Sequence, residues 1–362
     1  MEQKGQIVES EAVVVGAGAF GGWTALLLQE AGVRTLLVDA WGAGNQLSSS
    51  GGETRVLRAG YGELPLYSEM ALKARRLWKE REAQWGLDLL HERPILWIGT
   101  GDEPLLRDSL RTYQDLDVPH RRLSAAQVEG RFPDFRCRPP LSGLLELSAG
   151  VLFARKACRA VAQAFQQAGG RLIRGRARPP LTGEPLTQLE LEDGRILKAE
   201  RFLFACGPWM AALFDRDLED RLEVTRQEVY FFSPPAAHPA LEENGGPSCR
   251  LPIFYDASSQ GAHYGIPPLH GRGVKIASDI SGPAIDPDRD PRRPSAQSLR
   301  GVREFLAQRL PFLARAPLLE SRVCQYTRTA DRHFLLGPHP RIHNLFLLGA
   351  GSGHGFKHGP VV

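Results

Sequence analysis

The sequence has few cysteines and no recognisable cysteine pair. The five cysteines are odd in number, widely spaced and free of any CxxC motif, so they imply neither a disulfide framework nor a zinc site. We therefore expect a reducing compartment, place the protein in the cytoplasm and assign it no metal. The cysteines are Cys137, Cys158, Cys206, Cys249 and Cys324.

Two other features are scarce: uninterrupted apolar runs and clustered charge. The first ten residues carry acidic side chains, and glycines break the apolar run behind them, so the sequence indicates neither a signal peptide nor a membrane span. The 45 basic and 41 acidic residues are spread along the chain without the Lys/Arg stripe that nucleic acids require. We expect neither a nucleic-acid partner nor a membrane. The 362 residues, 42% of them apolar, suffice for two globular domains.

The first motif joins a strand, a glycine-rich turn and a helix. Ala12–Val15 is a short apolar strand that leads into the turn, and Trp23–Leu28 is a buried helix behind it. Gly16 permits the tight turn, Gly18 lets the backbone approach a pyrophosphate, and Gly21 lets helix and strand pack closely. The phosphates would face the helix N-terminus.

An acidic residue completes this motif. The second strand, Thr35–Val38, ends in Asp39, 23 residues after Gly16, where a carboxylate would bond the ribose hydroxyls of an adenosine. An acid at this position disfavours a 2′-phosphate. A glycine turn of no function is the alternative, but strand, helix and Asp39 in register favour dinucleotide binding.

Further elements favour an α/β fold: a Rossmann-like FAD-binding domain with an inserted mixed α+β substrate domain. An Asp-Gly turn lies between two alternating apolar segments, which is a strong hairpin signal. The remaining patterns predict two amphipathic helices and three strands. We expect helices at 66–85 and 151–168, strands at 171–174, 202–206 and 345–348, and the hairpin at 189–197.

Prolines and short strands gather in two segments, which we assign to the inserted domain. The substrate-binding domain then comprises residues 87–144 and 224–318. The FAD-binding domain is discontinuous and comprises residues 1–86, 145–223 and 319–362.

Several separated motifs together resemble the monomeric sarcosine oxidase family. That family includes N-methyl amino acid and pipecolate oxidases, within the wider D-amino-acid-oxidase-like flavoproteins. The resemblance runs from Val13 to the last residue and implies FAD as the cofactor. The motifs are Ser49–Arg58, Tyr61-Gly62, Tyr264–Lys275, Cys324–Phe334 and Ser352–Lys357.

Cys324 matches the position at which this family forms a thioether to the flavin 8α carbon. Such a link requires a thiolate beside an electrophilic methyl group, and nearby positive charge favours it. The resemblance therefore implies covalent FAD. The alternative is a small buried residue, because a free cysteine packs like an apolar side chain.

Two cations match the positions that hold the substrate carboxylate in the family, Arg58 and Lys357. The planar fork of an arginine suits a carboxylate, and a lysine adds a second charge that converges on it. Either residue alone could be a solvated surface cation. Arg55 resembles the family arginine near the flavin ring, and its alternative is an ion pair with Glu53 or Glu63.

The resemblance also implies roles for one more lysine and for two tyrosines. Lys275 matches a lysine that stabilises superoxide as dioxygen takes its first electron, and solvent exposure on a strand is the alternative. Tyr264 and Tyr326 match aromatic positions of the pocket. The alternative, of nearly equal weight, is that they are core tyrosines with satisfied hydroxyls. Backbone N–H groups at a helix N-terminus would face the reduced flavin pyrimidine. These would come from Gly351, Gly353 and Gly355.

The chain departs from the family at three places. Gly51 and Asp279 stand where sarcosine oxidases carry histidines, and an acid at 279 changes the charge of the pocket. The chain also stops at Val362, where the family continues into a helix that covers the flavin. Either the sequence is incomplete or flavin retention is weakened.

We therefore expect an FAD-dependent amine oxidase acting on a secondary amino acid, N-methylated or cyclic. It would form an imine and reduce O2 to H2O2, with a small-molecule amino acid or amine as partner and no further subunit. Two alternatives remain: a dehydrogenase of the same fold with another electron acceptor, and a truncated flavoprotein that binds FAD without turnover.

Overall fold

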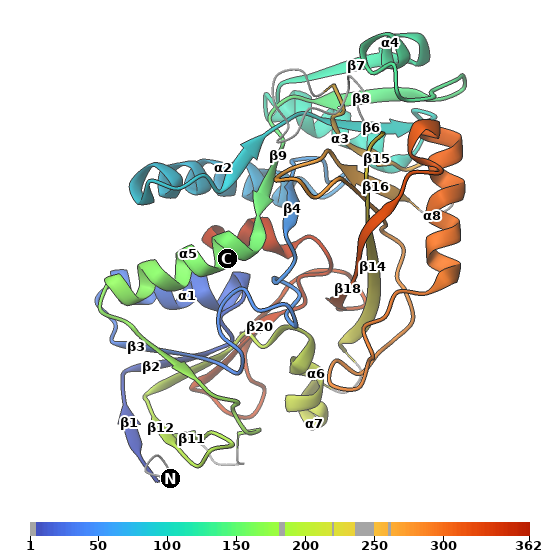
Figure 1. Cartoon of the computed structure of the whole chain (residues 1–362). Coiled ribbons are helices and arrows are strands. Elements are labelled where there is room, and N and C mark those ends of the chain that lie inside the picture. Colours follow the sequence, from blue (N-terminus) through green and yellow to red (C-terminus); the bar gives the residue numbers. More distant parts are fainter. Residues whose placement is uncertain (1–4, 181–184, 219–220, 236–249, 260–261) are drawn as a thin grey trace.

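The computed structural model has an α/β architecture with two large sheets (Figure 1). The α/β class confirms the fold expected from the sequence. Cys249 lies outside the part of the chain that the structure describes. The described residues are 5–180, 185–218, 221–235, 250–259 and 262–362.

The first sheet has six strands, of which five run parallel and the edge strand β19 is antiparallel to β20. Side chains alternate across it: Val13 and Val15 join the core on one face, and Val14 joins the core on the other. The order is β10 (Arg171–Arg174), β3 (Thr35–Asp39), β2 (Ala12–Val15), β13 (Arg201–Phe204), β20 (Leu345–Gly349) and β19 (Leu335–Pro338).

Two helices, α1 (Ala19–Glu30) and α5 (Ala154–Gln167), pack against each other on one face of this sheet (Figure 1). Leu197 packs from a small sheet on the other face. That sheet contains the expected hairpin, since β11 and β12 pair antiparallel. Its strands are β1 (Ile7–Glu9), β12 (Ile196–Lys198) and β11 (Gln188–Glu190).

The second large sheet has eight strands and is mixed, with β15 and β6 as its parallel pair. Helices α3 (Pro104–Asp115), α4 (Ala125–Arg131) and α8 (Ala296–Arg309) flank it (Figure 1). The strand order is β18 (Leu318–Arg328), β14 (Glu223–Phe232), β17 (Val274–Ser278), β16 (His263–Ile266), β15 (Ile253–Asp256), β6 (Ile95–Gly99), β8 (Ser142–Glu146) and β7 (His120–Ser124).

The expected domain boundaries cut through this sheet at two places. Strand β8 crosses the boundary at residue 144, and β18 pairs along most of its length with β14 although residues 319–362 are assigned to the FAD-binding domain. Strand β18 carries Cys324 and Tyr326. The division into domains therefore remains a proposal, with β18 placed beside the inserted segments.

The segment 151–168 begins as a strand, which corrects the expected helix. Gly150–Phe153 is β9, and it pairs with β4 (Thr54–Leu57) and β5 (Leu90–Glu92) before α5 starts at Ala154. Val151 and Leu152 are fully buried between these partners, so tertiary pairing outweighs the helical pattern.

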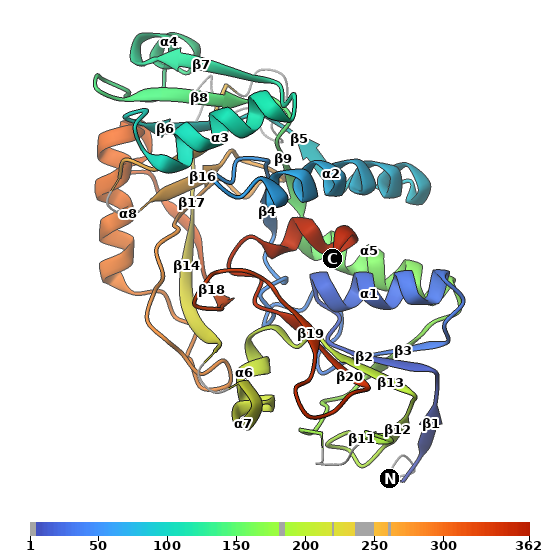
Figure 2. The same cartoon turned by 180° about the vertical axis from the view of Figure 1, so that it is seen from behind.

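Helix α2 (Pro65–Trp85) spans the expected range, and the apolar spacing places part of its buried face correctly, since Ala74 and Trp78 are buried. At the start of the helix the pattern is wrong, because Leu66 is 64% exposed and Tyr67 is buried instead. Figure 2 shows the C-terminal η4 (Gly355–Val361) between α1 and α2. The remaining short helices are η1 (Gly207–Trp209), α6 (Met210–Leu213), α7 (Asp215–Leu218) and η3 (Pro311–Leu313).

None of the helices in the described ranges is both long and apolar enough to cross a bilayer. Across the same ranges, no group of three or more His, Cys, Asp or Glu side chains is placed to hold a metal ion.

Candidate active site

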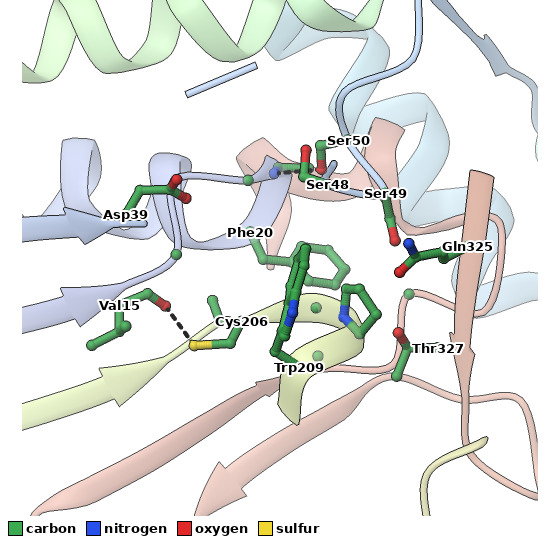
Figure 3. Close-up of a pocket in the computed structure, with 18 of the residues that line it drawn as sticks. Val15, Phe20, Asp39, Ser48, Ser49, Ser50, Cys206, Trp209, Gln325 and Thr327 are labelled. Carbon is green, nitrogen blue, oxygen red and sulfur yellow. Dashed lines mark hydrogen bonds between the residues drawn. The ribbon is translucent and has the colours of Figure 1, made fainter. Parts of the chain in front are cut away.

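A cavity of about 330 Å³ lies at the carboxyl ends of β2, β3, β13 and β20. Such an edge is where open parallel sheets bind nucleotides. Gly16, Asp39, Cys206 and Ala350 follow or end these strands and line the cavity. Figure 3 shows Asp39 and Cys206 on one side of it and Gln325 and Thr327 on the other.

The glycine turn has the geometry that the motif predicts. Gly16 has φ +105°, in the region that favours glycine. A Cβ on Gly21 would lie 1.9 Å from the carbonyl oxygen of Gly16 and 3.0 Å from the Cβ of Ala205, so only glycine allows α1 to approach β2 and β13 this closely.

Asp39 connects the first turn to the second strand. Its Oδ2 accepts a hydrogen bond from the Ala17 amide at 2.8 Å, and its Oδ1 accepts from the amides of Trp41 (2.9 Å) and Gly42 (2.7 Å). Burial raises the pKa of Asp39 while these amides oppose the shift. The carboxylate is thus fixed at the cavity wall, where ribose hydroxyls could donate to its remaining lone pairs.

Two unpaired hydroxyls on the wall support a fit to a large polar ligand. Ser49 Oγ and Thr327 Oγ1 are buried and have no hydrogen-bond partner among the described residues (Figure 3). Buried hydroxyls without partners are rare because desolvation makes them unfavourable. Nearby, no side chain caps α1 at Gly18, and Ala19 N donates to Ser50 Oγ at 3.0 Å. The exposed N-terminus of α1 suits a pyrophosphate.

A second cavity of about 500 Å³ adjoins the first, and both are lined by Arg55, Cys324, Tyr326, Gly353 and Phe356. Its wall is formed by β4, by strands β15 to β18 and by the loop before η4. The structure brings all the expected catalytic residues to this wall: Arg55, Arg58, Tyr264, Lys275, Tyr326 and Lys357.

Arg55 lies beside Cys324 where the two cavities meet. Its Nη2 donates to Cys324 Sγ at 3.4 Å and to the carbonyl of Ser49 at 2.5 Å. Within the described part of the chain, Arg55 forms neither of the alternative ion pairs, with Glu53 or with Glu63; Glu53 pairs with Arg155 (3.0 Å) and Arg322 (2.9 Å) instead.

Lys275 is buried, which contradicts the solvent-exposed alternative. Its Nζ donates to the carbonyl of Thr54 at 3.2 Å and lies 5.6 Å from the ring centre of Tyr264. Burial, and then the charge of Arg55, lower the pKa of Lys275 to about 7. The amine can therefore change its charge near neutral pH.

Arg58 and Lys357 converge on Tyr61. The Lys357 ammonium donates to Tyr61 Oη at 2.6 Å, and the Arg58 guanidinium carbon lies 4.5 Å from the centre of the Tyr61 ring. Burial, and then the charge of Arg58, lower the pKa of Lys357 well below its usual 10.5. Two cations on the wall of one cavity, Lys357 buried and Arg58 half-buried, are suited to bind an anion.

Four residues that surround these cations were given no role in the site from the sequence, although Tyr61 belongs to one of the motifs. Tyr61 hydrogen-bonds His358 at 2.8 Å, and Trp78 Nε1 donates to the carbonyl of Lys357 at 2.9 Å. Glu146 is buried near Arg58; burial raises its pKa, and the charge of Arg58 is among the effects that oppose this rise. No local motif marks Glu146, whereas its position in a buried strand is an unusual place for an acid.

The glycine loop before η4 departs from the prediction. The helix it precedes is a short 3₁₀ helix starting at Gly355, and the amides of His354 and Gly355 both donate to the carbonyl of Gly351. The N–H group of Gly355 is therefore used within the turn. Gly351 and Gly353 still line the first cavity.

A family model described as "FAD dependent oxidoreductase" matches residues 11–362. The chain is 30% identical to the peroxisomal sarcosine oxidase of Mus musculus, over 97% of this chain and 90% of that protein. It is 28% identical, with the same coverage, to the monomeric sarcosine oxidase of Arthrobacter sp. strain TE1826. The open form of NikD, an amino acid oxidase essential for nikkomycin biosynthesis, matches with a TM-score of 0.80 and 22% identity, over 98% of this chain and 92% of that one.

Proposed function

The chain belongs to the FAD-dependent oxidoreductase family, and we propose that it oxidises the C–N bond of a secondary amino acid, N-methylated or cyclic, with O2 as electron acceptor. One observation carries the proposal: two cations, the half-buried Arg58 and the buried Lys357, line a cavity that adjoins the dinucleotide cavity. A substrate carboxylate bound there would place its amine toward the junction of the two cavities.

FAD, when bound, would supply the two-electron chemistry of the reaction. The first cavity fits it, because Gly16, Gly18 and Asp39 lie where the adenosine diphosphate half would bind and Gly21 packs beneath them. We propose that Arg55, Cys324, Gly351, Gly353 and Gly355 hold the flavin half at the junction, near Lys357.

The residues of this chain would divide the remaining work. Arg58 and Lys357 hold the carboxylate, while Tyr264 and Tyr326 shape the pocket between them and the flavin half. Lys275 supplies a positive charge that stabilises superoxide when O2 takes its first electron. The position of Cys324 where the two cavities meet, in contact with Arg55 at 3.4 Å, supports it as the residue that tethers the flavin.

The relatives support a small-molecule substrate and a monomer, because the Arthrobacter protein is named a monomeric sarcosine oxidase. The wide spacing of the cysteines supports a reducing compartment, for which we propose the cytoplasm.

Purified yellow protein should produce H2O2 in air from at least one N-methyl or cyclic amino acid, and the same compound should bleach the flavin spectrum without oxygen. An Arg58→Ala variant that retains its FAD serves as the control and should lose most of this activity at low substrate concentration. Bleaching without peroxide would identify a dehydrogenase. A protein that no amino acid bleaches would contradict the proposal.

A further inference from the structure

Asp279 follows β17 and is an acid on the wall of the substrate cavity. The hydroxyls of Tyr326 and Tyr255 donate to its Oδ1 at 3.2 Å and to its Oδ2 at 3.3 Å. Both bonds are long for a carboxylate acceptor, so neither uses the full capacity of its oxygen. Since Tyr326 lines both cavities, this carboxylate lies close to their junction.

The cavity wall contains a second acid, Glu53, which is already neutralised. Its oxygens pair with Arg155 at 3.0 Å, Arg322 at 2.9 Å and Arg272 at 3.6 Å. Among the described residues, no cation forms an ion pair with Asp279 within 4.0 Å. Unlike Glu53, Asp279 is therefore not neutralised by a neighbouring cation and is available to bind a positively charged group of a ligand.

Asp279 and the two carboxylate-binding cations influence one another across the cavity. Burial raises the pKa of Asp279, and the charge of Arg58 opposes this rise. Burial lowers the pKa of Lys357, and the charge of Asp279 opposes that fall. They are thus near enough to interact and too far apart to pair. A gap of this kind, with cations on one side and a carboxylate on the other, is complementary to a zwitterion.

We propose that Asp279 binds the ammonium nitrogen of the substrate, so that the site recognises a zwitterionic amino acid by both of its charges. This inference rests on the proposed function and narrows it. Carboxylic acids without the amine would meet an unpaired negative charge in the cavity, and amines without the carboxylate would leave Arg58 and Lys357 unpaired. Both classes should bind weakly.

A pair of matched ligands tests the assignment. L-Pipecolate and cyclohexanecarboxylate have the same ring and carboxylate, but only pipecolate carries the ammonium group. In the holoenzyme, Asp279→Asn should raise KM for pipecolate about 10- to 100-fold. The inhibition constant of cyclohexanecarboxylate should stay the same or fall, because the repelling charge is gone.

Two further variants control for structural damage. Asp279→Glu keeps the charge and should restore a preference for pipecolate, whereas Glu53→Gln removes the neutralised acid and should leave the ratio of the two constants unchanged. If Asp279→Asn weakens both ligands equally, or neither, Asp279 does not bind the ammonium group.

The proposed function can fail separately from this inference. If no amino acid is oxidised, the same two ligands can be titrated by their perturbation of the visible flavin spectrum. If wild-type protein binds pipecolate more tightly than cyclohexanecarboxylate and Asp279→Asn loses this preference, Asp279 would still be supported as the ammonium site. A ratio that stays constant would overturn it even in an active oxidase.

Discussion

Glu146 is the buried residue whose replacement should be most informative about how the cations are supported. Its side chain is 1% exposed, its Oε1 accepts from the Ala59 amide at 2.7 Å, and its Oε2 accepts from Tyr113 Oη at 2.5 Å. Ala59 is next to Arg58, whose guanidinium donates to the carbonyl of Gly60. Glu146 therefore holds the backbone that carries the carboxylate-binding arginine.

The expected cost of Glu146→Ala follows from these two bonds. Ala59 and Tyr113 are themselves buried, so both donors would be left without an acceptor. Each unsatisfied buried donor costs about 1–3 kcal/mol, which gives a loss of about 2–6 kcal/mol in the free energy of unfolding. Glu146→Gln keeps an acceptor for Ala59 and should lose only about 1 kcal/mol.

The pH dependence of stability gives a second readout. Burial raises the pKa of Glu146 above its ordinary 4.5, so ionisation is disfavoured in the folded state. Glu146 therefore lowers the free energy of unfolding as the pH rises from 4.5 through the pKa of its folded state. Glu146→Gln should remove this part of the pH dependence.

Urea unfolding of the holoenzyme between pH 4.5 and 8, together with KM for the amino acid substrate, would measure both effects. KM should rise in Glu146→Ala, because Arg58 loses its support, and stay near the wild-type value in Glu146→Gln. If the Ala and Gln variants unfold within about 1 kcal/mol of each other, the network does not have the importance assigned to it.

Three further predictions concern the proposed site. Arg58→Ala and Lys357→Ala should each raise KM for the amino acid about tenfold or more, because each removes a charge-assisted hydrogen bond; unchanged KM in both would exclude a carboxylate site. Lys275→Met should slow flavin reoxidation far more than flavin reduction in stopped-flow measurements, and equal slowing would contradict the role. Because the Lys275 amine is cationic below its pKa of about 7, wild-type reoxidation should slow as pH rises through or above that value, and the Met variant should lack this step. Denatured wild-type protein should retain its yellow colour after precipitation, whereas Cys324→Ser should release all of its flavin.

The sequence predicted the elements whose determinants are local. Ala12–Val15, the glycine turn and Asp39 are close along the chain, and the structure has each where the motif requires it. The hairpin at 189–197 is equally local. Where a tertiary partner decides, the prediction was wrong: β9 is a strand because β4 and β5 pair with it, and Leu66 faces solvent although its spacing fits an apolar stripe.

The site was only partly predictable for the same reason. The contact between Arg55 and Cys324 spans 269 residues, and no pattern in either segment indicates that β4 and β18 meet. The family resemblance identified the residues that line the second cavity, whereas their hydrogen-bond partners are visible only in the folded structure. Glu146 lies 87 residues from Ala59, in a strand that reads as ordinary core.

Glu146 and Asp279, the two acids near Arg58 and Lys357, are suited to different roles because their hydrogen bonds and positions differ. Glu146 is withdrawn from the cavity, and short bonds from buried donors use both of its oxygens. Asp279 lies on the wall itself, and its two tyrosine donors are more distant. Glu146 is therefore suited to holding the backbone beside Arg58, and Asp279 to meeting a positive charge that arrives with the ligand. If the proposed roles hold, the cations select for a carboxylate, and the acid on the wall decides whether that carboxylate must be accompanied by an amine.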